Sequence, residues 1–347
     1  MNSHFSRSRL QEILKSFPSL RIAVLGDFAL DAYWFVDMAK AELSRETSLF
    51  NRPVVKESYS MGGSANVAWN LADLGVKQVS AFSALGNDWR GRLLKELMMK
   101  VGIHLQGCIT PPDWSTVMFI KILLTVDDQQ QEDARLDFIN LQHLSREWET
   151  SLLESLETCL PGLDALIVSD YQTVGVISPR MLKSLNALST KYPKTLFIVD
   201  SRERIGQYKN MILKPNQLEA VRAGKKESDV KNFSEDDLIS AGKYLQRQSE
   251  KPVFITLGER GCFIFEDHSR KSLPALKIPP PIDTVGAGDS FLAALTASLA
   301  AGASATEAAI IANLAAGVVI QKLNITGTAS PEEIVRVFND FYMDDSV

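Results

Sequence analysis

Residues Arg21–Gly26 read RIAVLG, a short run in which every residue between the arginine and the glycine is apolar. A strand buried on both faces needs such a continuous run, whereas a half-exposed strand alternates apolar with polar residues. Similar runs recur at residues 165–169 (ALIVS), 196–199 (LFIV), 211–213 (MIL) and 253–257 (VFITL). The chain therefore predicts a sheet of buried, parallel strands.

Helical patterns lie between most of these runs. Apolar residues recur at helical spacing in residues 65–74, 91–100, 146–160, 179–191 and 235–248. Alternation of strands with helices is typical of an α/β fold built on a doubly wound, mostly parallel sheet. No linker separates two domains, so we expect residues 1–347 to form a single domain.

Two segments depart from this alternation, at about residues 33–60 and 115–141. Both are rich in β-branched and aromatic residues, with polar residues interleaved. We expect them to form antiparallel strands or hairpins that are inserted into the α/β core as a small β-sheet lid. Because exposed sheet edges favour pairing, the lid also predicts a homodimer.

The composition limits the partners and the compartment. The 347 residues include 42 acidic and 37 basic side chains, which gives a net charge of −5. Proteins that bind duplex nucleic acid need clustered lysine and arginine, so this charge argues against such a partner. The three cysteines are scattered, which is typical of a reducing compartment. The opening MNSHFSRSRL carries no apolar signal core, and the apolar residues 290–320 are interrupted by Gly302 and Glu307. We expect a cytoplasmic protein with no nucleic-acid or membrane partner.

Polar side chains follow each predicted strand at its carboxyl end, where open parallel sheets bind their ligands. In chain order they are Asp27 and Asp31, then Asp170, then Asp200, Arg202 and Arg204, then Lys214 and Asn216, and finally Thr256. Loops are polar in most proteins, so one such residue alone indicates little. As a set they predict a polar binding cleft.

The most informative motif is Asp-Thr-Val-Gly-Ala-Gly-Asp-Ser-Phe at residues 283–291, which leads into an apolar helix. The first N–H groups of a helix lack intrahelical partners, so those of Gly286, Ala287 and Gly288 can bind a phosphate. Asp289 follows in the first turn, where a carboxylate can take the proton of an attacking hydroxyl. An acidic residue there also complements the helix dipole, but the flanking residues favour the catalytic interpretation.

These motifs resemble a known family. The C-terminal signature of the ribokinase-like (PfkB) carbohydrate kinases is similar to DTVGAGDSFLAAL in this chain. Their N-terminal signature is similar to GGSANVAWNLADLG at residues 62–75, and their N-x-x-E motif is similar to KPNQLE at residues 214–219. The motifs occur in family order, and the resemblance covers residues 21–337. Within the family, the likeness is greatest to heptose 7-phosphate kinases, the kinase half of ADP-heptose synthesis proteins, on the segments LGDFALDAYWF, SDYQTVGV and ARLDF.

Two segments differ from the heptose kinases. Residues 43–48, LSRETS, stand where those kinases usually read I-S-P-E-A-P, and residues 200–204, DSRER, replace their D-P-K-G. The chain also ends soon after the kinase signature, so we expect it to lack the nucleotidylyltransferase module of the bifunctional forms. The differences at residues 43–48 and 200–204 affect the prediction of the acceptor more than the prediction of the reaction.

The resemblance implies a role for each matching residue. It implies a base at Asp289, an anion hole at Gly286, Ala287 and Gly288, sugar contacts at Asp31, Gly62, Gly63 and Asn66, and nucleotide contacts at Asn216, Glu219, Thr256, Gly258, Gly261 and Asn313. Asp170 and Arg202, at the predicted cleft, are added as substrate contacts. Glu219 would also organise Mg²⁺ through water. Asp283 would help to bind a monovalent cation such as K⁺, together with carbonyls near Val285 and in residues 324–330.

Several of these residues also have a purely structural interpretation. Gly62 and Gly63 could form a tight strand–helix turn with Ser64 as the N-cap. Asn216 and Glu219 match a capping box as well as a nucleotide motif. The carboxylate of Asp283 could simply fix the turn that leads into the helix.

We therefore expect a kinase that uses ATP and Mg²⁺ to phosphorylate a sugar or sugar phosphate, with the anomeric hydroxyl of a heptose 7-phosphate as first choice. Arg202 and Arg204, two residues apart, would share one face and reach one anion, and Arg45 would add a guanidinium from the lid. These arginines could equally be solvated loop charges. The alternatives are a PfkB-type kinase for a hexose, pentose, ketose phosphate, nucleoside or vitamin alcohol, and a sugar-binding regulator without catalysis.

Overall fold

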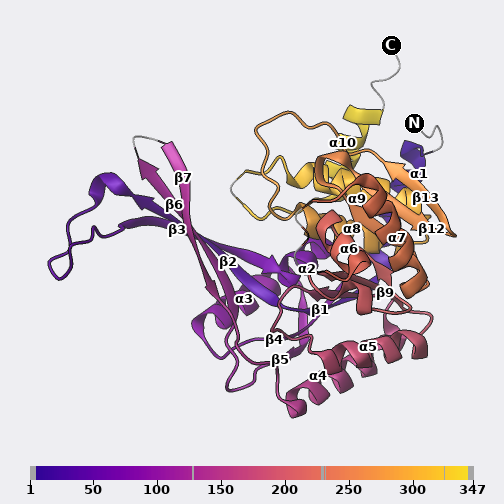
Figure 1. Ribbon diagram of the computed structural model, residues 1–347, viewed down its shortest axis with the longest axis horizontal. Helices are drawn as coiled ribbons and strands as arrows, with labels where there is room; N and C mark the ends of the chain where they lie inside the picture. Colours follow the sequence, from indigo (N-terminus) through magenta and orange to yellow (C-terminus); the bar gives the residue numbers. More distant parts are fainter. Residues whose placement is uncertain (1–4, 127–128, 228–229, 231, 324, 343–347) are drawn as a thin grey trace.

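The computed structural model describes residues 5–126, 129–227, 230, 232–323 and 325–342. Within these ranges nine strands form one sheet in the order β13-β12-β11-β10-β9-β8-β1-β4-β5 (Figure 1). The strands are β1 (Arg21–Gly26), β4 (Gln78–Ala84), β5 (His104–Ile109), β8 (Ala165–Asp170), β9 (Leu196–Ser201), β10 (Ile212–Leu213), β11 (Val253–Thr256), β12 (Cys262–Glu266) and β13 (Ser269–Leu273). Those from β5 to β11 run parallel, and β12 and β13 add an antiparallel edge. The predicted doubly wound, mostly parallel sheet is confirmed.

Helices cover both faces of this sheet, because successive side chains of each strand point to opposite faces. In β1, Ile22 and Val24 belong to one apolar cluster, and Ala23 and Leu25 belong to the other. The first cluster includes residues of α1 (Arg7–Ser16), α2 (Ser64–Asp73), α3 (Trp89–Lys100), α8 (Ala287–Ala300), α9 (Ala305–Val319) and α10 (Pro331–Tyr342). The second includes residues of α4 (Arg146–Cys159), α5 (Pro179–Lys191), α6 (Gln217–Lys225) and α7 (Glu235–Ser249). None of the described helices is long and apolar enough to span a membrane.

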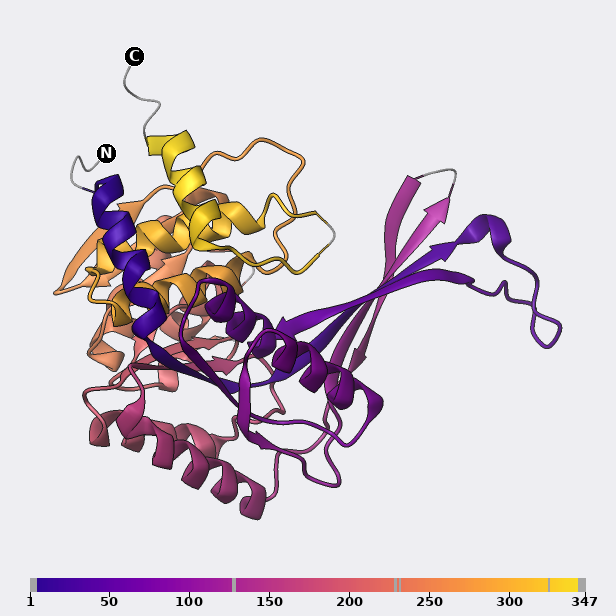
Figure 2. The same ribbon diagram turned by 180° about the vertical axis from the view of Figure 1, so that it is seen from behind.

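A second sheet projects from this body as an arm, as Figure 2 shows from behind. Its strands are β2 (Phe28–Asp37), β3 (Val54–Gly63), β6 (Val117–Val126) and β7 (Gln129–Phe138), in the order β3-β2-β6-β7. The two predicted insertions therefore pair into one lid, of which residues 127 and 128 lie outside the described part. The expected antiparallel hairpins are confirmed, β2 with β3 and β6 with β7, and the two hairpins meet through β2 and β6, which run parallel.

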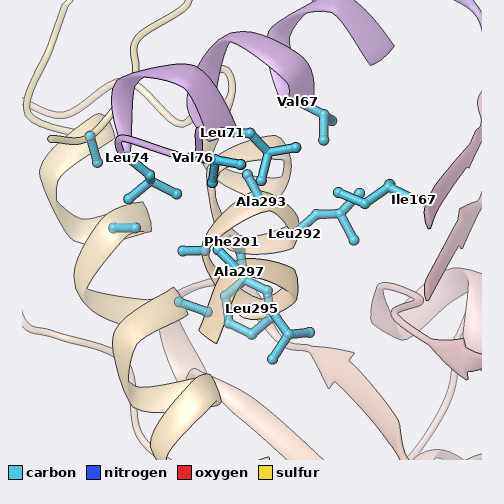
Figure 3. Packing of buried hydrophobic residues seen from close by; sticks show 14 of the residues in the cluster. Val67, Leu71, Leu74, Val76, Ile167, Phe291, Leu292, Ala293, Leu295 and Ala297 are labelled. Carbon is cyan, nitrogen blue, oxygen red and sulfur yellow. The ribbon is translucent and has the colours of Figure 1, made fainter. Parts of the chain in front are cut away.

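The packing of α2 against α8 connects the lid to the centre of the molecule (Figure 3). Helix α2 begins directly after β3, and its Leu71 meets Leu292 and Ala293 of α8. All three side chains are fully buried. The small alanine side chains along α8 allow the backbones of neighbouring helices to approach closely. The packing of α2 against α8 therefore helps to fix the position of α8.

We predict that Leu292→Ala lowers the free energy of unfolding by about 2–5 kcal/mol, because it leaves a cavity between α2 and α8. Urea unfolding followed by circular dichroism measures the change. Leu141→Ala is the control, since Leu141 is 83% exposed, and it should change stability by less than about 0.5 kcal/mol. A similar small loss for both variants would contradict the central place given to this contact.

Candidate active site

Two cavities meet beyond the carboxyl ends of the parallel strands. The first, of about 400 Å³, lies between these strand ends and the lid, and its lining includes Asp27, Asp31, Gly63, Tyr171, Asp200 and Asp289. The second, of about 1050 Å³, lies beside α8 and α9, and its lining includes Gly258, Gly261, Ala287, Phe291 and Asn313. Asn216, Thr256 and Gly288 line both cavities. The start of α8 therefore stands where the two spaces join.

Asp289 occupies the first turn of α8 and faces the first cavity. Its Oδ2 accepts a hydrogen bond from Nδ2 of Asn66 at 2.8 Å, and its Oδ1 accepts one from the hydroxyl of Tyr171 at 3.0 Å. Desolvation raises the pKa of Asp289 to about 6, although both hydrogen bonds favour the ionised form. The carboxylate is thus held in place and can accept a proton near neutral pH.

The backbone at the start of α8 has the geometry of an anion site. Gly286 is the N-cap, with a φ of 80°, which suits glycine. The N–H of Ala287 donates to the carbonyl of Thr284 at 3.3 Å, whereas within the described residues no hydrogen bond involves the N–H of Gly286 or Gly288. Of the three predicted cradle residues, Gly288 lines both cavities, Ala287 lines the second, and Gly286 forms the turn behind them.

Asp31 lies on β2 and faces the first cavity as predicted. Gly62 lies behind it, and a Cβ at Gly62 would approach Oδ1 of Asp31 to 2.3 Å. Gly62 is therefore needed to make room for this carboxylate, and Gly63 lines the cavity. The alternative with Ser64 as N-cap is wrong: Gly63 holds that position, and the Ser64 hydroxyl, inside the helix, has no hydrogen-bond partner in the described structure.

Two predicted substrate contacts belong to the supporting structure. Asn66 is buried, and its amide holds Asp289 instead of lining the cavity. Asp170 is also buried, where it accepts hydrogen bonds from Arg204, Ser201 and Tyr208. The prediction that Asp170 contacts the substrate is corrected accordingly: a buried carboxylate with a guanidinium partner is already neutralised.

The arginines are distributed differently from the prediction. Arg202 lines the first cavity, with its guanidinium 5.6 Å from the ring centre of Tyr171. Arg204 turns away to its ion pair with Asp170, because β9 ends at Ser201 and residues 202–204 form a turn, so the expected extended segment is wrong and the two arginines do not share one face. Arg45 is exposed and is not part of the cavity lining. Arg202 is the predicted arginine that the structure brings to the site.

The lid contributes two cations that sequence reasoning missed. Lys121 of β6 lies opposite Tyr33 of β2 and Arg135 of β7, and all three line the first cavity. Their side chains share one face of the lid because the register places them in one row. The alternation of polar and apolar residues in both strands was visible in the sequence, but the register that aligns them was not.

A buried ion pair and a helix cap complete the junction. Nζ of Lys214 lies 2.9 Å from Oδ2 of Asp200. Asn216 and Glu219 form a capping box at the start of α6, in which both Glu219 oxygens accept hydrogen bonds from Asn216. Burial and the charge of Asp200 raise the pKa of Glu219 to about 7. The structural interpretation of this pair is confirmed; Asn216 lines both cavities, and Glu219 lines the first.

The second cavity gathers the predicted nucleotide contacts other than Glu219. Thr256 ends β11, and Gly258 and Gly261 form the turn that follows, both at positive φ. A Cβ at Gly261 would approach the carbonyl oxygen of Leu273 to 2.0 Å. Nδ2 of Asn313 donates to the carbonyl of Pro274 at 3.1 Å. The sequence motif thus predicted residues that do share one cavity.

The loop before α8 is fixed by Asp283, whose Oδ1 accepts a hydrogen bond from the N–H of Val285 at 3.0 Å. Its own N–H donates to the carbonyl of Ile320. The interpretation of Asp283 as a turn-forming residue is therefore confirmed. The loop at residues 324–330 was predicted to complete a cation site. Its Asn324 lies outside the described residues. The carbonyl of Gly327, in the same loop, lies 3.5 Å from Nδ2 of Asn70.

Comparison with solved structures identifies the fold as that of the ribokinase-like sugar kinases. Phosphofructokinase-2 from Escherichia coli in complex with potassium superposes with a TM-score of 0.73 at 20% identity, over 92% of this chain and 99% of that one. Ribokinase from Arabidopsis thaliana complexed with ribose and ATP gives a TM-score of 0.68 at 19% identity, over 92% and 98%.

The chain belongs to the PfkB family of carbohydrate kinases, whose family model matches residues 22–333. It is 30% identical over 332 residues to the bifunctional protein HldE of Geotalea uraniireducens, which covers 95% of this chain and 65% of that relative. It is 28% identical over 336 residues to HldE of Wolinella succinogenes, covering 96% and 68%. The chain thus spans about two thirds of the length of these relatives. The predicted family and kinase class are confirmed.

We predict that Asp289→Asn retains nucleotide binding but lowers kcat by about 10²–10⁴-fold, because the amide cannot accept a proton. Release of ADP with the acceptor that wild type phosphorylates measures turnover, and calorimetry measures nucleotide binding. The control is Asp236→Asn on the exposed side of α7, which should leave both unchanged. Turnover within a few-fold of wild type would exclude Asp289 as the base.

We also predict that kcat/KM rises with pH through about 6 and then levels off. Asp289 acts as a base only when ionised, and its pKa is raised to about 6, so activity is lost as the pH falls through that value. Below it, the rate should fall about tenfold per pH unit. A flat profile between pH 5 and 7, with folding verified by circular dichroism, would contradict this assignment.

Proposed function

We propose that this chain is an ATP-dependent kinase that transfers the γ-phosphoryl group to the anomeric hydroxyl of a heptose 7-phosphate. The observation that carries the proposal is the position of Asp289 and Gly288 at the junction of two cavities. One cavity is lined by carboxylates and cations that suit a sugar phosphate, and the other is larger and suits a nucleotide. A phosphoryl group that passes between them meets the start of α8.

The mechanism follows from this arrangement. The acceptor hydroxyl, bound beside Asp31 and Asp289, loses its proton to Asp289 as its oxygen attacks the γ-phosphorus. The bond between that phosphorus and the oxygen shared with the β-phosphate breaks, and ADP leaves. Backbone N–H groups at the start of α8 stabilise the charge on the transferring group, and the α8 dipole adds to this effect.

Three cations support an acceptor that already carries a phosphate. Lys121 and Arg135 come from the lid and Arg202 comes from the loop after β9, and all of them line the first cavity. Arginine binds phosphate through paired N–H donors, which a neutral sugar does not need. The resemblance of LGDFALDAYWF, SDYQTVGV and ARLDF to heptose 7-phosphate kinases favours a heptose phosphate among such acceptors. A PfkB-type kinase for another sugar phosphate is the alternative.

The residues at the junction fit a magnesium ion that is held mainly by the nucleotide. Within the described residues, no group of three or more His, Cys, Asp or Glu side chains is arranged to hold a metal by itself. Glu219, whose oxygens are already hydrogen-bonded to Asn216, would reach the ion through water. When bound, Mg²⁺ would neutralise charge on the phosphates. For K⁺, the candidate residue is Asp283.

The lid supports a homodimer as part of this proposal. Its outer strands and tip expose the apolar side chains of Leu43, Leu49, Phe50, Val54, Val55, Leu136 and Phe138. Exposed apolar side chains in such numbers favour association with a second copy. We also keep a cytoplasmic location as a proposal, consistent with free thiols at Cys108, Cys159 and Cys262.

The proposal predicts that wild type phosphorylates heptose 7-phosphate at least tenfold more efficiently than the unphosphorylated heptose at fixed Mg·ATP. Arg202→Ala should reduce this preference about tenfold or more, because a charge-assisted hydrogen bond to the anion is lost. Arg45→Ala is the control and should keep the preference. Fructose 6-phosphate and ribose are tested in the same assay, so that a preference for a different acceptor is detected. Equal or better activity on the unphosphorylated heptose would defeat the proposal.

A further inference from the structure

Tyr171 is a cavity residue to which the mechanism above assigns no role. It follows β8, and its hydroxyl oxygen lies 3.0 Å from Oδ1 of Asp289 and 3.2 Å from Oδ2 of Asp200. The same Oδ2 of Asp200 lies 2.9 Å from Nζ of Lys214. A continuous chain of polar atoms therefore runs from the base to a lysine that is only 3% exposed.

The phenol has a single hydrogen, so it donates to one carboxylate at a time. Burial and the charges of Asp200 and Asp289 raise the pKa of Tyr171 well above its usual value, so the hydroxyl keeps this hydrogen. Asp200 is already neutralised by Lys214. While Asp289 is ionised, the hydrogen therefore stabilises more charge at Asp289 than at Asp200, which agrees with the shorter distance.

We propose that Tyr171 is a positioning residue for the base: its hydroxyl holds the ionised Asp289 toward the acceptor and turns to Asp200 once Asp289 has taken the proton. The inference rests on the proposed function insofar as Asp289 is the base. During transfer the acceptor O–H bond breaks and its oxygen bonds to the γ-phosphorus, while the bond from that phosphorus to the oxygen shared with the β-phosphate breaks and ADP leaves; the proton goes to Asp289. Tyr171 keeps its own proton throughout and changes only the direction in which it donates.

Several groups face Asp289 besides Tyr171, and their effects on its pKa have known signs. Asp200 of β9 and Asp31 of β2 are like charges that disfavour its ionised form, whereas Lys214 after β10 and Asn66 of α2 favour it. Replacement of the Tyr171 hydroxyl alone leaves these groups in place. The expected change therefore has one sign: the pKa of Asp289 rises.

The experiment measures the titration of Asp289 in the unliganded full chain by NMR of ¹³Cγ-labelled aspartate, with Asp289→Asn identifying the resonance. In Tyr171→Phe the pKa of Asp289 should rise by about one unit. With Mg·ATP and heptose 7-phosphate, kcat should then fall about fivefold at pH 6 and little at pH 8, because fewer bases are ionised at the lower pH. Incorporation of 3-fluorotyrosine at residue 171, a stronger donor, should shift the pKa in the opposite direction.

The matched control is Tyr208→Phe, which removes another buried hydroxyl, one that donates to Asp170 at 2.9 Å. It should leave the Asp289 resonance and the pH profile unchanged. An unshifted titration in Tyr171→Phe, or an equal shift in Tyr208→Phe, would overturn the positioning role. Because the NMR readout needs no turnover, a shifted titration in a chain that phosphorylates no acceptor would defeat the proposed function alone.

Discussion

The hydrogen bond from Asn66 to Asp289 joins the two helices on which the site depends. Helix α2 begins where the lid strand β3 ends, and α8 carries the anion-binding turn and the base. Beneath this polar contact, Leu71 and Leu292 pack α2 against α8 in the buried core. Apolar packing fixes the distance between the helices, and the amide fixes the orientation of the carboxylate. The lid is thus connected through α2 to the helix that bears Asp289.

The charged residues that line the first cavity come from both the body and the lid, in different proportions. The body contributes four carboxylates and two cations to the lining, whereas the lid contributes one carboxylate and two cations. Those of the body are Asp27, Asp200, Glu219, Asp289, Arg202 and Lys214, and those of the lid are Asp31, Lys121 and Arg135. In the body part of the lining the carboxylates therefore outnumber the cations, which disfavours a phosphorylated acceptor. The lid row supplies the compensating charge only where it faces the body. This division gives the lid a chemical role in addition to the exclusion of water.

Much of this organisation was predictable from local patterns. The apolar runs predicted the parallel strands β1, β8, β9, β10 and β11, although not their order in the sheet and not β4 and β5. The Gly-Ala-Gly-Asp motif predicted the start of α8. Local patterns could not predict the register of the lid strands or which polar side chains are buried. The carboxylate of Asp170 was assigned to the substrate because it follows a strand, yet the fold brings Arg204 and Tyr208 to it. Lys121 and Arg135 were missed because their alignment depends on the pairing of β6 with β7 and of β2 with β6.

We propose that the start of α8 passes a phosphoryl group from one cavity to a hydroxyl held in the other. The most direct test is ³¹P NMR of wild-type protein incubated with Mg·ATP and heptose 7-phosphate. The account predicts a new phosphate resonance coupled to the anomeric proton, formed in equal amount with ADP, while the 7-phosphate resonance persists. Release of ADP without a second sugar phosphate, or phosphorylation at a carbon other than the anomeric one, would contradict it.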